Sequence, residues 1–273
     1  MNKHKGVKQL SEFLNSIRHF IFDVDGTLLL GKQSLPYASE VIELLKEKQL
    51  DFTILSNNSS YSIEENLARL ESVLEVELKP EHLYTSTHAT IDYLLKNQIT
   101  SCYIIGTPGM INDLEEKGIK NNFEKPQAII LGFDKTLNYE KIQKTALLLQ
   151  NEEQIPFFAT HPDDTCPTEK GDIPDVGSFL KMFEQATGRT ADIIFGKPNE
   201  IILKLCLSKS NVDFSEVLVI GDRLETDIKM ANFVGIKSVI VLTGETMLED
   251  LKKHTTTPTK IWKNLEELYN FLK

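Results

Sequence analysis

The sequence predicts an α/β fold, a doubly wound, Rossmann-like parallel sheet with a second, smaller α/β unit inserted into it. At both ends of the chain, short apolar runs alternate with segments of helical periodicity. Such alternation is typical of a parallel sheet with helices on both faces. The middle of the chain has its own apolar runs and helical segments, and these predict the inserted unit.

Length, composition and charge exclude several classes of protein. The 273 residues are 41% hydrophobic and 26% charged, as in an ordinary globular protein. With 40 acidic and 30 basic residues the net charge is −10, which argues against a nucleic-acid partner because phosphate backbones require a basic face. Three scattered cysteines indicate neither a disulfide framework nor a zinc site. Without a signal peptide or an apolar run of membrane-spanning length, we expect a cytoplasmic protein with no membrane partner.

The first elements follow one another closely. Apolar residues at helical spacing predict a short helix over 8–17, and the apolar run 19–22 predicts a buried strand. A helix over 38–48, a strand over 52–55 and a helix over 62–74 continue the alternation.

The middle and the last third of the chain repeat this pattern. In the middle, strands are predicted at 102–105, 128–131 and 156–159, and helices at 139–150 and 178–187. In the last third, the pattern predicts a helix over 200–207, a strand over 217–220, a helix over 226–233 and a strand over 238–242. We therefore expect a core domain formed by residues 1–85 and 191–273, with residues 86–190 as the insertion.

The first chemical motif comes directly after the strand at 19–22. Asp23 and Asp25 lie two residues apart and Gly26 allows a sharp turn, so both carboxylates can converge on one small site. One of them can serve as a nucleophile and the other as a general acid and base. The alternatives are a pair of solvated turn residues or a calcium loop, but a calcium loop needs a later glutamate where this chain continues with leucines.

Two further segments could bind phosphate. Ser56 and Asn57 follow the strand at 52–55, where a hydroxyl and backbone N–H groups can cradle an anion, although an ordinary helix cap fits the same residues. Lys197 is held between a glycine and a proline and is suited to a phosphate oxygen. A merely solvated lysine is the alternative.

The fourth segment follows the strand at 217–220. Asp222 and Asp227 are five residues apart across a turn into a helix, so one of them can reach a hard cation such as Mg²⁺ while the other orients water or Lys197. The alternative is that both acids stabilise the helix dipole. Four carboxylates and a lysine at strand ends nevertheless suit Mg²⁺ and phosphate better than a structural role.

These motifs, Asp-x-Asp-Gly-Thr, Ser-Asn-Asn, Gly-Lys-Pro and Gly-Asp-x-x-x-x-Asp, occur in the order of the haloacid dehalogenase-like (HAD) phosphatases, which the chain resembles. The segments 159–163 and 241–244 are similar to those of the NagD and p-nitrophenyl-phosphatase subfamily. The chain departs from that pattern at His161, where asparagine is common, and in its long N-terminal segment.

The resemblance implies a role for each matching residue. Asp23 would be the nucleophile and Asp25 the acid and base. Asp23, Asp222 and the backbone carbonyl of Asp25 would bind Mg²⁺, with Asp227 behind them. The phosphate-binding residues would be Ser56, Asn57 and Lys197.

The position of the insertion implies a cap of the C2 type. The gap between Thr27 and Ser56 holds no domain, whereas the gap between Ser56 and Lys197 holds about 100 residues more than one helix needs. In the resembled superfamily such a cap supplies substrate specificity and often contributes to homodimers. Polar residues of the insertion either face the leaving group or form a solvated surface: Asp134, His161, Asp163, Asp164, Thr165, Lys170 and Asp175.

The sequence thus predicts a Mg²⁺-dependent phosphatase that cleaves small phosphate monoesters, such as sugar phosphates or nucleoside monophosphates, through an aspartyl phosphate on Asp23. A phosphotransferase or a catalytically silent phosphate-binding protein on the same fold are the alternatives.

Overall fold

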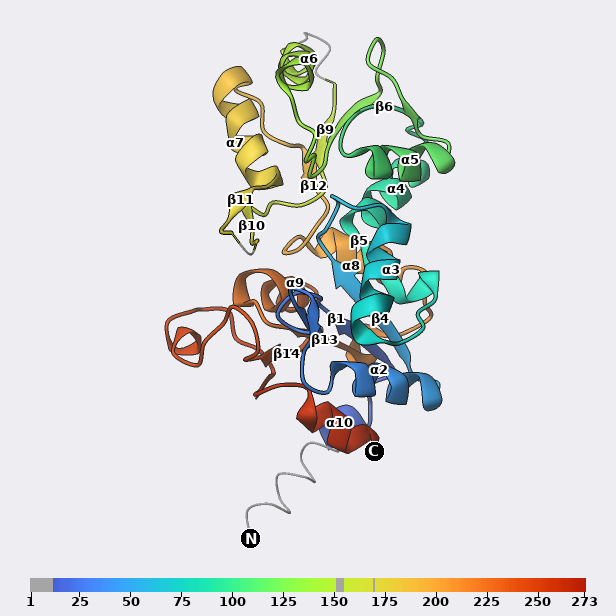
Figure 1. Ribbon diagram of the computed structural model, residues 1–273, viewed down its shortest axis with the longest axis vertical. Helices are drawn as coiled ribbons and strands as arrows, with labels where there is room; N and C mark the ends of the chain where they lie inside the picture. The colour runs from blue at the N-terminus through green and yellow to red at the C-terminus, as the bar shows by residue number, and fades with distance from the viewer. Residues whose placement is uncertain (1–11, 151–154, 169) are drawn as a thin grey trace. The chain divides into compact units, whose positions relative to one another are not determined.

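The computed structural model describes residues 12–150, 155–168 and 170–273. It confirms the predicted α/β fold, with a parallel core sheet and a second parallel sheet in the inserted part (Figure 1). The predicted helix over 8–17 lies in part outside the described residues. The chain divides into two compact units, the first formed by Met1–Leu55, Leu67–Tyr84 and Leu207–Lys273 and the second by Ser56–Asn66 and Thr85–Cys206. The assignment of residues 86–190 to a cap domain stays a prediction.

The first unit is built on a sheet of six strands. Their order across the sheet is β15 (Lys260–Trp262), β14 (Lys237–Val241), β13 (Val217–Gly221), β1 (His19–Phe22), β4 (Asp51–Ser56) and β5 (Leu83–Thr85). All four residues of β1 are buried, as expected of a strand covered on both faces. β1 is parallel to β13 and to β4, and Phe22 pairs with Ile220. The carboxyl ends of β1 and β13 therefore lie next to each other.

Short helices and a small hairpin complete this unit. These elements are the hairpin β2 (Leu29–Leu30) and β3 (Gln33–Ser34), the helices α2 (Ala38–Glu47), α3 (Ile63–Leu74), which begins in the second unit, α9 (Lys229–Phe233) and α10 (Glu266–Leu272), and single turns at Pro80–His82, Phe214–Glu216 and Asp250–Lys252. In α2 the buried residues Ala38, Val41, Ile42 and Leu45 recur at helical spacing. α2 also lies beside α10 (Figure 1).

The second unit has its own sheet and its own core. The strands run in the order β12 (Ile193–Ile194), β9 (Phe157–Ala159), β8 (Ala128–Leu131), β6 (Ser101–Ile105) and β7 (Lys120–Asn121), all parallel. The other elements are the antiparallel pair β10 (Thr165–Cys166) and β11 (Ile173–Pro174) and the helices α4 (Ser86–Lys96), α5 (Pro108–Glu116), α6 (Tyr139–Leu149), α7 (Val176–Thr187) and α8 (Glu200–Leu207). Leu131, Phe157 and Phe183 are fully buried in its core.

One predicted helix differs in its first turn. The sequence predicts a helix over 226–233, whereas the structure has a π-helical segment at Leu224–Ile228 that continues into α9. Within it the carboxylate of Asp227 turns back and accepts a hydrogen bond from the backbone N–H of Arg223, with an N–O distance of 3.2 Å. Short π-helical segments are frequent at functional sites.

Among the described residues, no helix is long and apolar enough to cross a membrane. The cytoplasmic location stays a prediction.

A buried carboxylate in the second unit makes stability depend on pH. Asp113 of α5 accepts a hydrogen bond of 2.9 Å from the backbone N–H of Ile63. Burial raises the pKa of Asp113 to about 6, although this hydrogen bond opposes the shift. Because the folded pKa lies above the unfolded value of 3.8, the folded state binds more protons between these values. The contribution of Asp113 to stability is therefore present below about pH 4 and is lost as the pH rises through 6.

Asp113→Asn should remove this dependence, because asparagine stays neutral and keeps an acceptor for the N–H of Ile63. After allowance for solvent screening, we expect the variant to gain about 1 kcal/mol over the wild type at pH 7 and little at pH 4. Urea unfolding at both pH values measures the difference. The exposed Asp172→Asn is the matched control. Equal curves for wild type and Asp113→Asn at pH 7 would refute the prediction.

Candidate active site

Three carboxylates of the first unit form a compact cluster at the carboxyl ends of β1 and β13. Asp23 follows β1, Asp222 follows β13, and Asp227 belongs to the π-helical segment. Each offers one oxygen, and these oxygens lie within 4.8 Å of one another. Asp222 and Asp227 are almost fully buried. The sheet register brings Asp23 and Asp222 together, because Phe22 and Ile220 are direct neighbours on parallel strands.

Three glycines leave the space that these carboxylates occupy, and a Cβ on the one in the loop after β14, Gly244, would overlap the carboxylate of Asp222. Gly26 has a φ of +87°, and a Cβ built on it would overlap the carboxylate of Asp222. A Cβ on Gly221 would overlap the carboxylate of Asp227. The glycines in Asp-x-Asp-Gly and in Gly-Asp-x-x-x-x-Asp are therefore required by close packing against the cluster as well as by the turn.

Backbone hydrogen bonds fix the orientation of the buried members. The N–H of Glu245 donates to Oδ2 of Asp222 over 2.7 Å, and the N–H of Arg223 donates to Oδ2 of Asp227. The hydroxyl of Thr243 donates to the carbonyl of Gly26 over 2.6 Å, which ties the loop after β14 to the loop after β1. The loop after β14 thus supports the cluster from one side.

The donor set fits a hard divalent cation. It consists of carboxylate oxygens alone, which Mg²⁺ and Ca²⁺ prefer over nitrogen or sulfur ligands. Three carboxylates held this close also repel one another unless a cation or protons compensate their charge. Asp227 belongs to this cluster, whereas the sequence places it behind the ligands.

Asp25 lies outside the cluster. Its side chain is 58% exposed and pairs with Arg69 of α3, with 3.0 Å between Oδ1 and the guanidinium. Arg69 also donates to the carbonyl of Gly31 over 3.4 Å. The carboxylate predicted to be the acid and base thus pairs with a cation on the part of α3 that belongs to the first unit.

The predicted phosphate-binding residues belong to the second unit. Ser56 ends β4, and its hydroxyl accepts the N–H of Asn58 over 3.1 Å. The helix cap of α3 is supplied by Ser62, which accepts the N–H of Glu65 while Glu65 accepts the N–H of Ser62. Ser56 and Asn57 therefore form a turn ahead of the helix and do not cap it.

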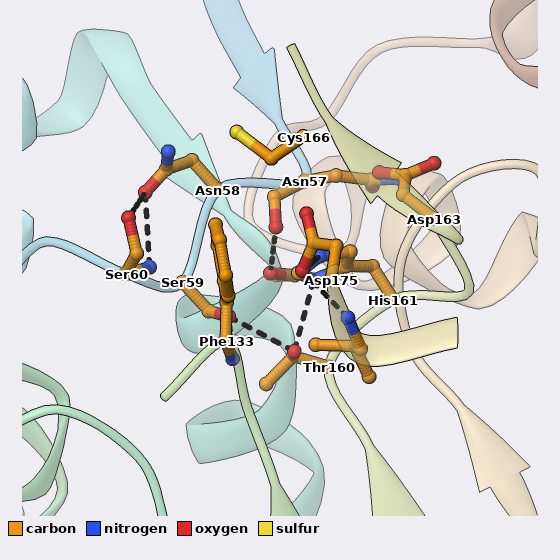
Figure 2. Close-up of polar contacts among 12 residues, drawn as sticks. Asn57, Asn58, Ser59, Ser60, Phe133, Thr160, His161, Asp163, Cys166 and Asp175 are labelled. Atoms are coloured by element: carbon orange, nitrogen blue, oxygen red, sulfur yellow. Dashed lines mark hydrogen bonds and ion pairs between the residues drawn. The ribbon is translucent and has the colours of Figure 1, made fainter. Parts of the chain in front are cut away.

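Asn57 and Lys197 are joined through the backbone of the lysine. Oδ1 of Asn57 accepts the N–H of Lys197 over 2.7 Å, and Nδ2 donates to the carbonyl of Lys197 and to Oδ2 of Asp163, each over 3.0 Å. Figure 2 shows Asn57 close to Asp163. Lys197 is buried, and its bond to Pro198 is cis.

The polar residues predicted to face a leaving group have different surroundings. Asp134 is buried and bound by Thr136 and Lys141, so it stabilises its own turn. Asp164 pairs with Lys181 at the surface. Thr165 and Lys170 are exposed.

His161 and Asp175 bind each other in the interior of the second unit. Nε2 of His161 lies 3.0 Å from Oδ1 of Asp175, which also accepts the first N–H of α7. Nδ1 lies 2.9 Å from the hydroxyl of Thr160, which in turn contacts the hydroxyl of Ser59 (Figure 2). This buried network links α7 to the segment that follows β4.

Two residues that contact the predicted site residues, Arg69 and Glu245, were not predicted from the sequence. Arg69 lies on the face of an amphipathic helix, where charged residues are common, and nothing in the sequence links it to Asp25. Glu245 contributes a backbone N–H, and backbone groups leave no signature in residue type. The similarity of the 241–244 segment to a known subfamily was the one indication that this loop belongs to the site.

Comparison with known families agrees with the cluster and the fold. The model of the haloacid dehalogenase-like hydrolases matches residues 20–120, which include Asp23, Asp25 and Ser56. A second HAD-hydrolase-like model matches residues 194–268, which include Lys197, Asp222 and Asp227. The chain belongs to the haloacid dehalogenase-like hydrolases and is a phosphatase of that family.

Within the family, the chain is of the NagD and p-nitrophenylphosphatase type. It is 37% identical to the 4-nitrophenylphosphatase of Thermotoga maritima, with a TM-score of 0.90 over 96% of this chain and 99% of that one. NagD of Escherichia coli K-12 is 26% identical, with a TM-score of 0.84 over 91% and 97% of the two chains. The acid sugar phosphatase of Staphylococcus aureus is 32% identical over 93% of this chain and 97% of its own length.

Proposed function

We propose that this phosphatase hydrolyses small phosphate monoesters with the help of Mg²⁺, through an aspartyl phosphate formed on Asp23. The observation that carries the proposal is the cluster of Asp23, Asp222 and Asp227, whose oxygens lie within 4.8 Å of one another directly after two neighbouring strands. A nucleophilic carboxylate beside a hard-cation site is what phosphoryl transfer to an aspartate requires.

Asp23 and Asp25 divide the chemistry between them. Asp23 attacks phosphorus in line with the leaving oxygen, and the bond between phosphorus and that oxygen breaks as the bond to Asp23 forms. Asp25 gives a proton to the leaving alcohol. Asp25 then takes a proton from water as the water attacks the aspartyl phosphate, which releases inorganic phosphate and restores Asp23.

Charge compensation comes from the remaining residues. Ser56 and Lys197 bind phosphoryl oxygens, with Lys197 supplying a positive charge. Asp23, Asp222, the carbonyl of Asp25 and, by its position in the cluster, Asp227 would hold the Mg²⁺, which when bound lowers the repulsion between a carboxylate and a phosphate dianion. The buried setting of Asp222 and Asp227 strengthens these interactions, because water screens them less.

The proposed substrates are sugar phosphates or nucleoside monophosphates. A sugar phosphatase and a 4-nitrophenylphosphatase are among the relatives that the chain covers almost completely. The proposed role of the insertion, residues 86–190, is to contact the leaving alcohol. A cytoplasmic location would supply such metabolites. Association into a homodimer remains part of the proposal, and light scattering would test it.

Removing divalent metal tests the proposed cofactor. Phosphate release from a panel of sugar phosphates, nucleoside monophosphates and 4-nitrophenyl phosphate is measured in EDTA and after Mg²⁺ is returned. We expect EDTA to lower turnover by roughly a hundredfold or more, because several kcal/mol of charge stabilisation is lost, and Mg²⁺ to restore it. Undiminished turnover after dialysis against chelator would overturn the metal-dependent scheme.

The same panel separates a hydrolase from a phosphotransferase. Both share the transfer to Asp23 and differ in the acceptor of the second step. Stoichiometric free phosphate in the presence of added glycerol or glucose supports hydrolysis. Formation of a new phosphate ester in place of free phosphate would favour a transferase.

A further inference from the structure

We propose that Asn57 is a positioning residue, whose side-chain amide holds the backbone of Lys197 and so fixes the place from which the lysine side chain extends. The inference rests on the proposed function, in which Lys197 binds the phosphoryl group. It assigns Asn57 a different part from the direct phosphate contact that the sequence predicts.

The amide of Asn57 pairs with both backbone groups of Lys197. It accepts the N–H of Lys197 over 2.7 Å and donates to its carbonyl over 3.0 Å. Two hydrogen bonds to one residue constrain its position and its rotation together, much as a neighbouring strand does in a ladder. These bonds join residues 140 positions apart in the sequence.

Asp163 fixes the direction in which this amide points. The second donor of Nδ2 goes to Oδ2 of Asp163 over 3.0 Å. A carboxylate can only accept, and the backbone N–H of Lys197 can only donate, so both partners require the same orientation of the amide. The amide of Asn57 has two N–H donors, and Asp163 and Lys197 use both. A phosphate could bind this side chain as a donor only by displacing one of them.

The preceding glycine allows the segment to pack this closely. The N–H of Gly196 donates to the carbonyl of Thr160 over 2.6 Å. A Cβ on Gly196 would lie 2.6 Å from Oδ1 of Asn57 and 2.6 Å from Cβ of His161. Glycine at this position therefore lets the Gly-Lys-Pro segment lie against Asn57 and His161, and any larger residue would push Lys197 away from the amide.

Backbone placement matters for a lysine because the long side chain, with its four rotatable bonds, starts from the backbone. An unsupported backbone would add to that freedom and misplace the ammonium group. Misplacement of about 1 Å can cost about a hundredfold in rate. The amide of Asn57 provides the support that the flexible side chain cannot provide itself.

A double-mutant cycle tests the proposal. The variants Asn57→Ala, Lys197→Ala and the double variant are compared with the wild type by kcat and KM for 4-nitrophenyl phosphate with saturating Mg²⁺. If Asn57 acts through Lys197, Asn57→Ala lowers kcat by about a hundredfold in the wild-type background and by less than about threefold in the Lys197→Ala background. If Asn57 contacts the phosphate or supports the fold in general, the two losses multiply.

Neighbouring positions provide matched controls. The side chain of Asn58 accepts the N–H groups of Ser60 and Tyr61, so Asn58→Ala should lower kcat by the same factor in both backgrounds. Asp163→Asn keeps an acceptor for Asn57 and should retain more activity than Asp163→Ala. Should Asn57→Ala not fold, Asn57→Asp, which keeps the acceptor for the N–H of Lys197, replaces it in the same cycle.

The double-mutant cycle has three distinguishable outcomes. Near-native turnover of Lys197→Ala contradicts the proposed function itself. A large loss in Lys197→Ala combined with multiplicative losses contradicts the positioning role and leaves the proposed function standing. A large loss in Lys197→Ala combined with an Asn57 effect that disappears in that background supports both.

Discussion

Asp23→Asn is expected to lower kcat by roughly four to six orders of magnitude, the scale of loss when an enzyme is deprived of its nucleophile. The amide is close to isosteric with the carboxylate but cannot form the aspartyl phosphate. Phosphate release from a sugar phosphate and from 4-nitrophenyl phosphate measures the loss. Both substrates should be affected alike, because in the proposed scheme neither leaving group departs without attack by Asp23.

The matched control for Asp23→Asn is Asp51→Asn. Asp51 is the first residue of β4. It therefore lies at the amino ends of the strands, away from Asp23 at their carboxyl ends, and it is exposed. Its replacement makes the same change in charge and should leave kcat unaltered. Quenched wild-type enzyme should also yield a protein-bound phosphate that hydroxylamine removes, as it does from acyl phosphates. Turnover by Asp23→Asn near the wild-type rate would rule out this residue as nucleophile.

Asp25→Asn is expected to lower kcat for alkyl phosphates by about a hundredfold to ten-thousandfold, the usual contribution of general acid–base catalysis. An alkoxide is a poor leaving group and needs the proton that Asp25 is proposed to supply. Nitrophenolate is a good leaving group and departs without a proton from the enzyme. With 4-nitrophenyl phosphate the first step should therefore stay fast while hydrolysis of the aspartyl phosphate becomes slow.

A rapid-mixing experiment separates the two steps. Asp25→Asn should release one equivalent of nitrophenolate per enzyme in a burst, followed by slow steady turnover. The wild type should show a much smaller burst or none. Slow release of nitrophenolate from the first turnover onward would contradict the assignment of Asp25 as acid and base, because the first step would then depend on something other than proton donation.

Much of the fold could be predicted because its elements are strongly patterned. The buried strands at 19–22 and 217–220 are continuous apolar runs, and the structure has strands at both positions. The elements that were missed are short or lack a distinct pattern. β12 has two residues, β15 has three, and α4 begins with Ser-Thr-His-Ala-Thr, which has weak helical preference. Their formation depends on contacts with distant parts of the chain.

In the site, too, the features that follow from local sequence pattern could be predicted, and those that depend on contacts between distant residues could not. Asp23 and Asp222 could be placed together because strand ends of a parallel sheet share one edge. The side-chain direction of Asp25 could not be predicted, because its partner Arg69 is 44 residues away. The mutual contact of His161 and Asp175 was missed for a similar reason, since each was considered as a separate loop residue.

The ion pair between Asp25 and Arg69 is easily broken. With the two side chains 58% and 30% exposed, such a pair contributes about 0–1 kcal/mol, which is comparable to thermal energy at room temperature. Arg69 therefore gives the carboxylate a resting orientation without trapping it. In the proposed scheme Asp25 serves first an alcohol and then a water molecule, and this freedom lets its carboxylate turn between the two during each cycle.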